Sequence, residues 1–545
     1  MNIEQTIKTL LEKALKESYD LEVETIHIEQ PKEKQNGDFS TNLAMSLAKT
    51  LKTNPFNIAQ EIVKNIDKPD LVETIDVARP GFINFYLSET VFSNVLKDIL
   101  IQKDDYGTSK VGDGEKINIE FVSVNPTGNM HVGHARGAAA GDSMSRIMEK
   151  AGFDVTKEFY VNDGGNQIHN LAQSINVRYH ELFGRTLEMG SDGYHGPEIL
   201  ELAQSIKDEY GDTFLYEDGY QYFREHGVQY LLNGIKNDLH AFGVSFDVFF
   251  SEKTLYDKGE VSKTLKHLKE QGYTYEKDDA LFLKTTNYGD EKDRVIVKRD
   301  GTYTYLLPDI AYHKNKMDRG FTQLIDILGG DHHGYIDRLN AAVQMVGGTA
   351  DTLNVDILQM VKVLQDGEEI KMSKRSGKSI TLRDLIDEVG KDAIRYFFSK
   401  HSLNTHMDLD LDLAIKKSND NPVFYVQYAH ARIHTLFNKA LEQGHQIDRT
   451  HQNYQTLNNE KTLDLLKLLN NYPQVVLDAA LKRTPHKITN YVHALASALH
   501  SFYSAVPILK GEALHIKEHL NVLEATRIVL NDALSLIGVD APKSM

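Results

Sequence analysis

The feature that most constrains the fold is a strand, a turn and a helix that follow one another within residues 117–150. Apolar residues alternate from Ile117 to Phe121, which indicates a strand. The turn-forming sequence Asn125-Pro126-Thr127-Gly128 comes next, and a helix is predicted from about His134 to Lys150. Because strand and helix patterns go on alternating as far as about residue 400, this part of the chain is predicted to form a parallel α/β sheet.

The start of that helix carries the first chemical motif, His131-Val132-Gly133-His134. The first N–H groups of a helix have no partner within the helix and favour a phosphate. Glycine and alanine in the following turns leave room for a flat base and a ribose, and two imidazoles can hydrogen-bond to phosphate oxygens as negative charge develops there. A zinc site is the alternative. No third ligand lies nearby in the sequence, so the pattern favours a nucleotide.

A basic loop about 240 residues further along the chain is the second motif. Apolar residues on either side of Asp366-Gly367 predict a β-hairpin, which leads into Lys371-Met372-Ser373-Lys374-Arg375. Lysines and an arginine on one loop can neutralise a pyrophosphate leaving group. Taken alone, such a loop is a common solvated surface feature. Following an HVGH helix in the same α/β domain, it indicates a triphosphate site.

Changes of pattern divide the chain into three parts. Residues 1–110 are predicted to form an α+β unit, and residues 111–400 the α/β domain, with a mostly helical and acidic insertion at about 185–290. Strand patterns then stop, so residues 401–545 are predicted to be all-helical. One of these helices is expected to open at Thr484-Pro485 and to bury along one face Ile488, Val492, Leu495, Leu499 and Phe502.

Composition limits the class of protein. The formal net charge of −17 argues against binding nucleic acid over the whole surface. Residues 401–545 contain as many basic as acidic residues, so a local, salt-sensitive patch for a polyanion stays open there. No apolar run approaches the roughly 20 residues of a membrane span. The chain has no cysteine, which excludes disulfides and cysteine-bound zinc. We expect a cytoplasmic protein that does not enter a membrane.

Together the two motifs resemble the signatures of class I aminoacyl-tRNA synthetases, and their surroundings are similar to the arginyl-tRNA synthetase family. The resemblance covers the whole chain. It implies an additional domain that contacts the tRNA D-loop, a Rossmann-type catalytic domain and a helical anticodon-binding domain for the three parts in turn. Four stretches carry the closer match to the arginyl family: residues 120–134, 160–167, 300–312 and 329–335.

The resemblance also implies a reaction. L-arginine would be activated by ATP to arginyl-adenylate and transferred to the 3′-terminal ribose of tRNA-Arg, with release of AMP and pyrophosphate. Mg²⁺ would be carried with ATP, no metal would be held by the protein, and activation would require bound tRNA. A monomer is expected. Catalysis is assigned to His131, His134, Lys371 and Lys374.

One departure from the family concerns Gly128. Many arginyl enzymes degrade the basic-loop signature and place a compensating lysine where this chain has Gly128, while the loop here is intact. We therefore expect the leaving phosphate to depend on Lys371 and above all Lys374. The side chains of Asp331-His332-His333 could form a metal cluster or line the adenosine pocket, and the resemblance favours the adenosine pocket. ATP binding is assigned to Gly128, His131, Gly133, His134, Asp331, His332, Met372, Ser373 and Lys374.

An arginine side chain needs carboxylates and flat acceptors, because a guanidinium is planar and always charged. Glu120 and Asp309 are such groups. Without the motif context, Glu120 would be taken for a solvated strand end and Asp309 for a helix N-cap. The resemblance assigns arginine binding to Glu120, Ser123, Asn125, His134, Tyr305 and Asp309.

Contacts with tRNA are expected in the first and last parts of the chain. Tyr425, Tyr428 and Arg432 share one helix face by their spacing and would form a stacking platform for unpaired bases. The spacing fits equally well with Tyr425 and Tyr428 as two half-buried core residues. Asn84 matches a position that contacts a D-loop base in the family that the chain resembles. From the sequence alone it could equally be an asparagine at the edge of a sheet. The residues assigned to tRNA are Asn84, Tyr425, Tyr428 and Arg432.

Two other functions stay open on the sequence. One is a class I synthetase for another amino acid. The second is a nucleotidylyltransferase that uses HxGH without tRNA, which would need neither a helical tail nor an N-terminal RNA-reading unit. A non-catalytic RNA binder is disfavoured because both motifs are complete.

Overall fold

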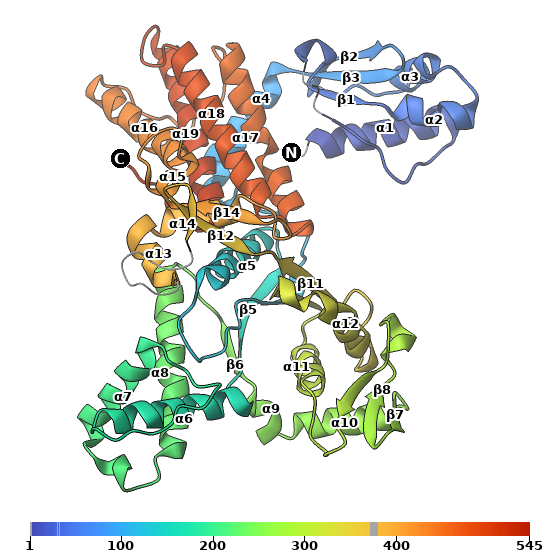
Figure 1. The fold of residues 1–545 in the computed structure, drawn as a ribbon. Helices are drawn as coiled ribbons and strands as arrows, with labels where there is room; N and C mark the ends of the chain where they lie inside the picture. The colour runs from blue at the N-terminus through green and yellow to red at the C-terminus, as the bar shows by residue number, and fades with distance from the viewer. Residues whose placement is uncertain (1–2, 30, 32, 371–379) are drawn as a thin grey trace.

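The computed structural model describes residues 3–29, 31, 33–370 and 380–545 (Figure 1). Lys371, Met372, Ser373 and Lys374 of the basic loop therefore lie outside the described residues. Among the helices that are described, none combines the length and the apolar character that crossing a membrane requires.

The N-terminal part is a small α+β unit, as predicted. Its three strands form an antiparallel sheet in the order β1-β3-β2, and buried Ile7, Leu11 and Ala14 mark the inner face of the first helix. Its elements are α1 (Ile3–Tyr19), β1 (Phe39–Thr41), α2 (Leu43–Leu51), α3 (Pro55–Lys64), β2 (Val72–Ala78) and β3 (Phe82–Leu87).

Helix α4 (Glu89–Gln102) leaves this unit and packs against α17 (Glu460–Leu481) and α19 (Ala513–Leu536). In Figure 1 it runs behind the C-terminal helices and away from the N-terminal sheet. The last helix of the range 1–110 thus lies spatially with the far end of the chain.

The central sheet has five parallel strands in the order β11-β10-β4-β5-β6, which confirms the Rossmann-type α/β prediction. Helix α5 follows β4 directly and is buried along most of its length. The elements are β4 (Lys116–Glu120), α5 (Val132–Lys150), β5 (Asp154–Val161), β6 (Val248–Ser251), β10 (Gln323–Gly329) and β11 (Leu353–Leu358).

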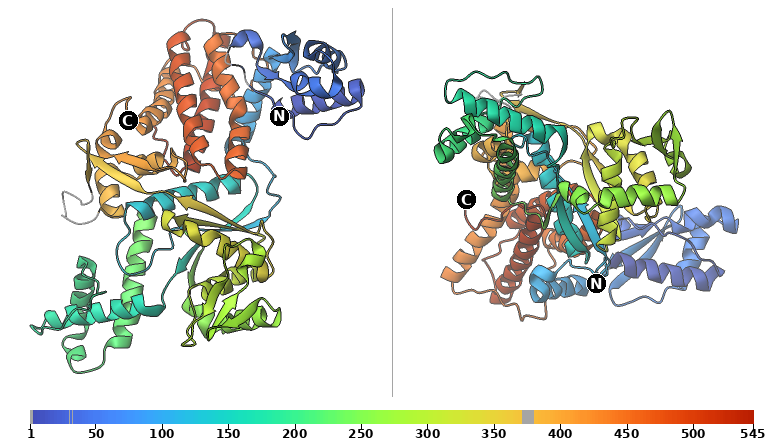
Figure 2. Two further views of the ribbon diagram at one scale, coloured as in Figure 1. Left: turned by 45° about the vertical axis from the view of Figure 1, so that its right-hand side comes forward. Right: turned by 90° about the horizontal axis from the view of Figure 1, so that it is seen from below.

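The range 185–290 is not one insertion, because β6 lies inside it and forms the edge of the central sheet. Two excursions leave the sheet instead. The first is a helical arm, which both views of Figure 2 show at the end of the molecule opposite the N-terminal unit. It consists of α6 (Gly165–Glu181), α7 (Pro197–Tyr210) and α8 (Tyr220–Ala241).

The second excursion joins β6 to β10 and carries a three-stranded antiparallel sheet. Its helix α11 returns to the central sheet. The elements are α9 (Lys253–Asp257), α10 (Glu260–Glu270), β7 (Thr274–Lys277), β8 (Ala280–Leu283), β9 (Arg294–Val297) and α11 (Leu306–Asp318); α12 (Ile336–Met345) follows β10.

The predicted hairpin is present as far as Ile370. Strands β12 (Val361–Gln365) and β13 (Glu368–Ile370) pair antiparallel, and Asp366 and Gly367 between them both have positive φ, 53° and 78°. These angles suit a tight Asp-Gly hairpin turn. Strand β14 (Met407–Asp410) adds to β12 in parallel, so the range 401–545 is not wholly helical. With four residues, β14 is too short for its sequence to show a period.

The rest of the C-terminal part is helical, as predicted. The helix expected at Thr484-Pro485 begins at His486 with Pro485 as its N-cap, and its five predicted inward residues are all buried. Before this bundle come α13 (Leu382–Val389), α14 (Lys391–Ser399) and α15 (Leu411–Ile415). The bundle itself consists of α16 (Pro422–Glu442), α17, α18 (His486–Ala505) and α19.

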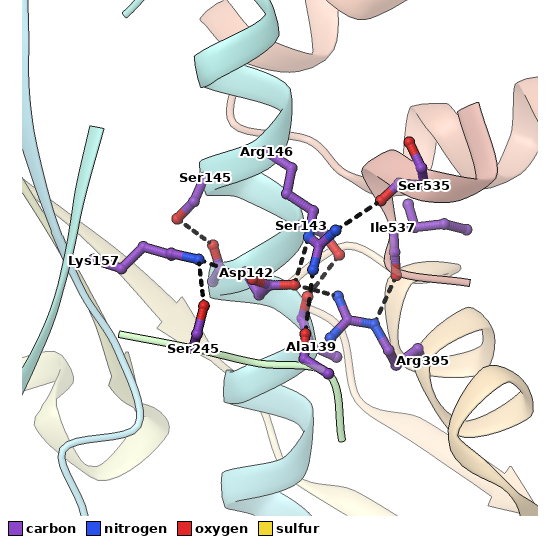
Figure 3. A network of polar contacts seen from close by, with 12 residues as sticks. Ala139, Asp142, Ser143, Ser145, Arg146, Lys157, Ser245, Arg395, Ser535 and Ile537 are labelled. Carbon is purple, nitrogen blue, oxygen red and sulfur yellow. Dashed lines mark hydrogen bonds and ion pairs between the residues drawn. The ribbon is translucent and has the colours of Figure 1, made fainter. Parts of the chain in front are cut away.

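A buried charge cluster joins α5 to this C-terminal part (Figure 3). Asp142 of α5 is fully buried and accepts from Arg395 of α14 at 2.6 Å and from Arg146 at 2.8 Å. Arg395 also donates to the carbonyl of Ile537 at 2.9 Å. The helix that starts with the HVGH motif is therefore fixed near its middle, through Arg395, to the end of α19.

Candidate active site

The two histidines of the first motif build the start of α5. Nδ1 of His131 accepts the main-chain N–H of Gly133 at 3.1 Å, and Nδ1 of His134 accepts the main-chain N–H of His131 at 3.3 Å. The rings stack with centroids 3.7 Å apart. Since both Nδ1 atoms accept, a neutral ring must carry its proton on Nε2, which leaves Nε2–H as a donor for a ligand.

Both rings are neutral near pH 7. Burial lowers the pKa of His131, and burial together with the neighbouring His131 lowers the pKa of His134 to about 4. Two neutral rings can stack without like-charge repulsion. The start of α5 therefore offers two neutral N–H donors and the positive end of a helix dipole to a phosphate.

Most of the glycine and alanine in α5 serves packing within the protein. The alanines from Ala135 to Ala140 are buried, and a Cβ on Gly141 would lie 2.2 Å from the ring of Phe121. The expectation that these turns make room for a base and ribose is therefore wrong beyond the first turn. Only residues 131–134 remain partly accessible to a nucleotide.

The chain leaves β4 through a strained bend that fixes Glu120. Val122 and Ser123 have φ of 69° and 36°, the left-handed region that β-branched residues avoid. Ser123 Oγ donates to Glu120 Oε1 at 2.9 Å and accepts from the main-chain N–H of Tyr160 at 3.0 Å. Glu120 is 7% exposed, so it is not a solvated strand end.

Asp309 lies in the first turn of α11, whose N-cap is Tyr305, so the N-cap alternative for Asp309 is wrong. The hydroxyl of Tyr335 donates to Asp309 Oδ2 at 2.5 Å. Burial raises the pKa of Asp309 to about 6, and the charges of Glu120 and Asp326 add to the rise while Tyr335 opposes it. Burial is therefore the main reason why Asp309 ionises less readily than a solvated aspartate.

Glu252, which the sequence analysis did not select, belongs to the same acidic group. It follows β6, and burial raises its pKa to about 7, with further contributions from Asp309 and Asp163. The signal for Glu252 was its place after a strand of the sheet, since ligands of parallel sheets bind at the carboxyl ends of strands. The sequence does not show this signal, because β6 lies within the range 185–290 that the sequence predicts to be an insertion.

A cavity of about 620 Å³ lies beside this acidic group. Glu252 lines it directly, and so does Tyr305, whose side chain is 83% exposed. Asp309 follows the lining residue Pro308, while Glu120 lies deeper. The cavity is also lined by Gly164, Gly165, Asn166, Arg224, Lys253, Tyr256, Lys298, Tyr303 and Thr304. Its lining carries one carboxylate, Glu252, and three tyrosines, which suit a flat cation, together with three cationic side chains, Arg224, Lys253 and Lys298.

Asn125, assigned to arginine, and the remaining described residues assigned to ATP lie near the start of α5 or at the end of β10. Asn125 and Gly128 are half-buried in the segment between β4 and α5. Gly133 is in the first turn of α5. Asp331 and His332 lie in a 3₁₀ helix, Gly330–Tyr335, directly after β10; His332 is exposed, and only the backbone of Asp331 is described.

The basic loop lies outside the described residues, but the chain that follows it contacts the HVGH segment. Thr381 forms a β-bridge with His131, and the N–H of Leu382 donates to the carbonyl of Met130 at 2.8 Å. Residues 381 and 382 therefore lie directly against the start of α5. Within the described part of the chain, no group of three or more histidine or acidic side chains is arranged to hold a metal ion.

Of the four residues assigned to tRNA, Asn84 is 3% exposed and its amide oxygen accepts from Ser40 Oγ at 2.7 Å. Its strand, β3, is the central one, so the strand-edge alternative is wrong. A base could reach Asn84 only after a local rearrangement.

The other three form a continuous aromatic and basic surface on α16 and α18. Tyr425 packs on His493 and His500, Tyr428 is 39% exposed, and the guanidinium of Arg432 lies 3.5 Å from the ring centre of Tyr503. Tyr428 is therefore not a core residue, and it offers a ring face beside a cation.

Three family models match the chain. They are described as the N-terminal domain of arginyl tRNA synthetase (residues 5–87), the catalytic domain of class I (R) tRNA synthetases (95–434) and the DALR anticodon binding domain (426–545). An arginine–tRNA ligase of Bacillus licheniformis is 48% identical over 557 aligned residues, and one of Bacillus subtilis is 47% identical over 561. Both alignments span 100% of each chain.

Solved structures give the same result. An arginyl-tRNA synthetase structure from Campylobacter jejuni is 35% identical, with a TM-score of 0.78, and covers 84% of this chain and 100% of its own. The arginyl-tRNA synthetase of Thermus thermophilus is 22% identical and supports the fold alone, with a TM-score of 0.77 over 99% of this chain and 100% of its own.

Proposed function

The chain belongs to the arginyl-tRNA synthetase family, and from this premise we propose which of its residues carry out the reaction. It is an arginine–tRNA ligase of class I, with arginine, ATP and tRNA-Arg as its substrates. The observation that carries the assignment of residues is the group of carboxylates beside the start of α5. The assignments below rest on that group, on the geometry of the two histidines and on the family.

The arginine side chain enters the cavity that Glu252 lines in this proposal. Its guanidinium takes Asp309 and Glu120 as partners, with Glu252 on the cavity wall and Tyr305 at the rim. Ser123 acts by holding Glu120, and Asn125 holds the amino-acid portion. Burial is the main cause of the raised pKa of Asp309 and of Glu252, and a cation beside them would stabilise their ionised forms.

Activation takes place at the start of α5. A carboxylate oxygen of arginine forms a bond to the α-phosphorus of ATP while the bond to pyrophosphate breaks. Nε2–H of His131 and of His134 donate to phosphate oxygens, which stabilises charge as it develops. Lys371 and Lys374 neutralise the leaving pyrophosphate. ATP is also contacted by Gly128, Gly133, Asp331, His332, Met372 and Ser373.

Mg²⁺ is proposed to arrive with ATP as part of that substrate. The described residues offer no dedicated group of metal ligands, and Mg²⁺ commonly binds through phosphates and water with only one or two carboxylates. When bound, it would supply charge neutralisation at the phosphates.

Transfer of arginine requires the 3′ end of the tRNA at the same cavity. We assign anticodon-side contacts to Tyr425, Tyr428 and Arg432 within residues 401–545, and a D-loop contact to Asn84 within residues 1–110, with residues 111–400 as the catalytic domain. The proposed enzyme is a cytoplasmic monomer. Sedimentation of the purified chain tests this oligomeric state, because a monomer has a mass of 61.7 kDa.

The direct test is ATP–pyrophosphate exchange with each amino acid, with and without tRNA-Arg. Exchange that depends on arginine and on tRNA supports the proposal. Exchange with a different amino acid would identify another class I specificity, and exchange that ignores both tRNA and amino acids would point to a nucleotidylyltransferase.

The two carboxylates Asp309 and Glu252 predict a pH dependence for arginine. Asp309 and Glu252 have pKa values raised to about 6 and about 7, and only their ionised forms attract a guanidinium. We expect kcat/KM for arginine to rise as the pH rises from about 5.5 to about 7.5, by about ten-fold per pH unit between the two pKa values and more steeply below both, and to level off above that. Exchange rates at saturating ATP measure it.

Glu252→Gln is the control, since it should remove the upper of the two midpoints and leave the lower. His134 does not interfere, because its pKa is lowered to about 4 and its ring is already neutral in this range. Burial lowers the pKa of His131 as well, which moves its titration away from the upper midpoint. A profile that is flat from about pH 5.5 to 7.5 would contradict the assigned arginine pocket.

A further inference from the structure

Three carboxylates lie side by side across the middle of the central sheet. Glu120 on β4 pairs in register with Glu158 on β5 and with Asp326 on β10. All three are buried, at 7%, 0% and 2% exposure. Adjacent buried acids repel one another and persist only if cations compensate them.

Helix α11 supplies those cations. Lys316 is 0% exposed, and its Nζ donates to Glu120 Oε2 at 2.6 Å and to Asp326 Oδ1 at 3.0 Å. Three residues later, Arg319 donates to both oxygens of Glu158, at 2.7 and 2.8 Å. Burial disfavours the charge on Lys316, but Asp326 and Glu120 outweigh burial and raise its pKa, so the ammonium is charged.

The same group reaches Asp309. The second oxygen of Asp326 lies 2.9 Å from His313 Nε2, and His313 Nδ1 donates to the main-chain carbonyl of Asp309 at 2.8 Å. Asp309, His313 and Lys316 share one face of α11 by their spacing of four and three residues. Lys316 and Asp326 thus connect the two carboxylates that we assign to the guanidinium.

We propose that Lys316 is a positioning residue that makes the amino-acid pocket select a guanidinium over a primary ammonium, such as that of lysine. This inference rests on the assignment of Glu120 and Asp309 to the substrate side chain. Glu120 has one oxygen on Lys316 and the other on Ser123, so its orientation is fixed and its charge is already shared.

Selection follows from the form of the substrate charge. A guanidinium spreads its charge over a planar group and can share a carboxylate edge that already faces a cation. An ammonium concentrates the same charge at one point and is strongly hydrated. Close to Glu120 it is repelled by Lys316, and it finds few lone pairs of the Glu120 carboxylate that are still free to accept a hydrogen bond. In a variant without Lys316, the ammonium group of a lysine substrate could occupy the position of Lys316 Nζ beside Glu120 and Asp326.

The test compares Lys316→Met with Arg319→Met. Both remove a cation of α11 that compensates the row of acids, but Arg319 contacts Glu158, which we do not assign to the substrate. ATP–pyrophosphate exchange with tRNA present gives kcat/KM for arginine and for lysine. We expect Lys316→Met to lower the arginine-to-lysine ratio by about ten-fold or more, with KM for ATP unchanged, and Arg319→Met to leave the ratio as it is.

Lys316→Met leaves two buried acids without their cation and can fail to fold. The double variant Lys316→Met/Asp326→Asn removes one charge of each sign and tests the same point in a charge-balanced interior. An unchanged ratio in a folded Lys316 variant, or an equal loss in Arg319→Met, would overturn the inference. If Asp309→Asn also leaves the kinetics with arginine unchanged, the pocket itself is wrongly assigned. If Asp309→Asn changes the kinetics with arginine but the Lys316 variants do not change the arginine-to-lysine ratio, the pocket is correctly assigned and this inference is wrong.

Discussion

Replacing His134 by asparagine will lower arginine-dependent ATP–pyrophosphate exchange by about 100- to 1,000-fold, the usual loss when one donor is removed from a site that stabilises developing charge. The asparagine Oδ1 can still accept the main-chain N–H of His131, as His134 Nδ1 does at 3.3 Å, so the helix start is kept. What the variant lacks is Nε2–H. Steady-state exchange should show the loss in kcat, with KM for ATP and arginine changed far less.

Glutamine at position 134 is the matched control. Its longer side chain places an amide donor near the position of Nε2, so we expect His134→Gln to exceed the asparagine variant in kcat by at least about ten-fold. Melting temperatures of the two variants should be similar. If both lose the same activity, or if asparagine retains most of it, His134 does not donate to the phosphate.

Replacing Asp309 by asparagine is expected to raise KM for arginine by about 100-fold and to leave KM for ATP unchanged. The variant keeps the shape of the side chain but removes the charge that a guanidinium would pair with, and a hydrogen bond between charged groups is worth about 1.5–3 kcal/mol. The lower midpoint of the arginine pH profile should disappear as well, because the pKa of about 6 belongs to Asp309. Exchange kinetics with arginine and with ATP varied in turn measure both effects.

Tyr335→Phe separates the charge of Asp309 from its hydrogen bond. It removes the hydroxyl that donates to Asp309 Oδ2 but leaves the carboxylate. We expect a change in KM for arginine of less than about ten-fold, since a neutral donor contributes about 1 kcal/mol. Equal effects of the two substitutions would mean that Asp309 acts in packing and not as a partner of the substrate.

Parts of the site could be predicted because their chemistry is bound to a local pattern. The HVGH segment follows a strand and a turn, and the structure places His131 at the helix start with both imidazoles capping it. The Asp366-Gly367 hairpin and the inward face of α18 are equally local. In each case the residues that determine the structure lie within a few positions of one another, so backbone geometry alone relates them.

Glu252 and Lys316 could not be found in this way. Glu252 gains its role from β6, a four-residue strand whose place at the edge of the sheet depends on pairing with β5. Lys316 reads in the sequence as an ordinary helix lysine, and it contacts Glu120 across 196 residues. Its burial, and the row of acids that makes burial possible, exist only once β4, β5 and β10 stand side by side.

The sequence by itself determined the parallel α/β domain, the helical C-terminal part, the nucleotide motif and the family that the relatives confirm. The tertiary structure decided which acids face the cavity, which cation holds Glu120, and that α4, β6 and β14 belong with distant partners. The physical reason is the distance along the chain between the residues that interact. Helix starts and turns are determined by neighbouring residues, whereas the ionisation of a buried group depends on every charge within a few ångströms, whatever its distance along the chain.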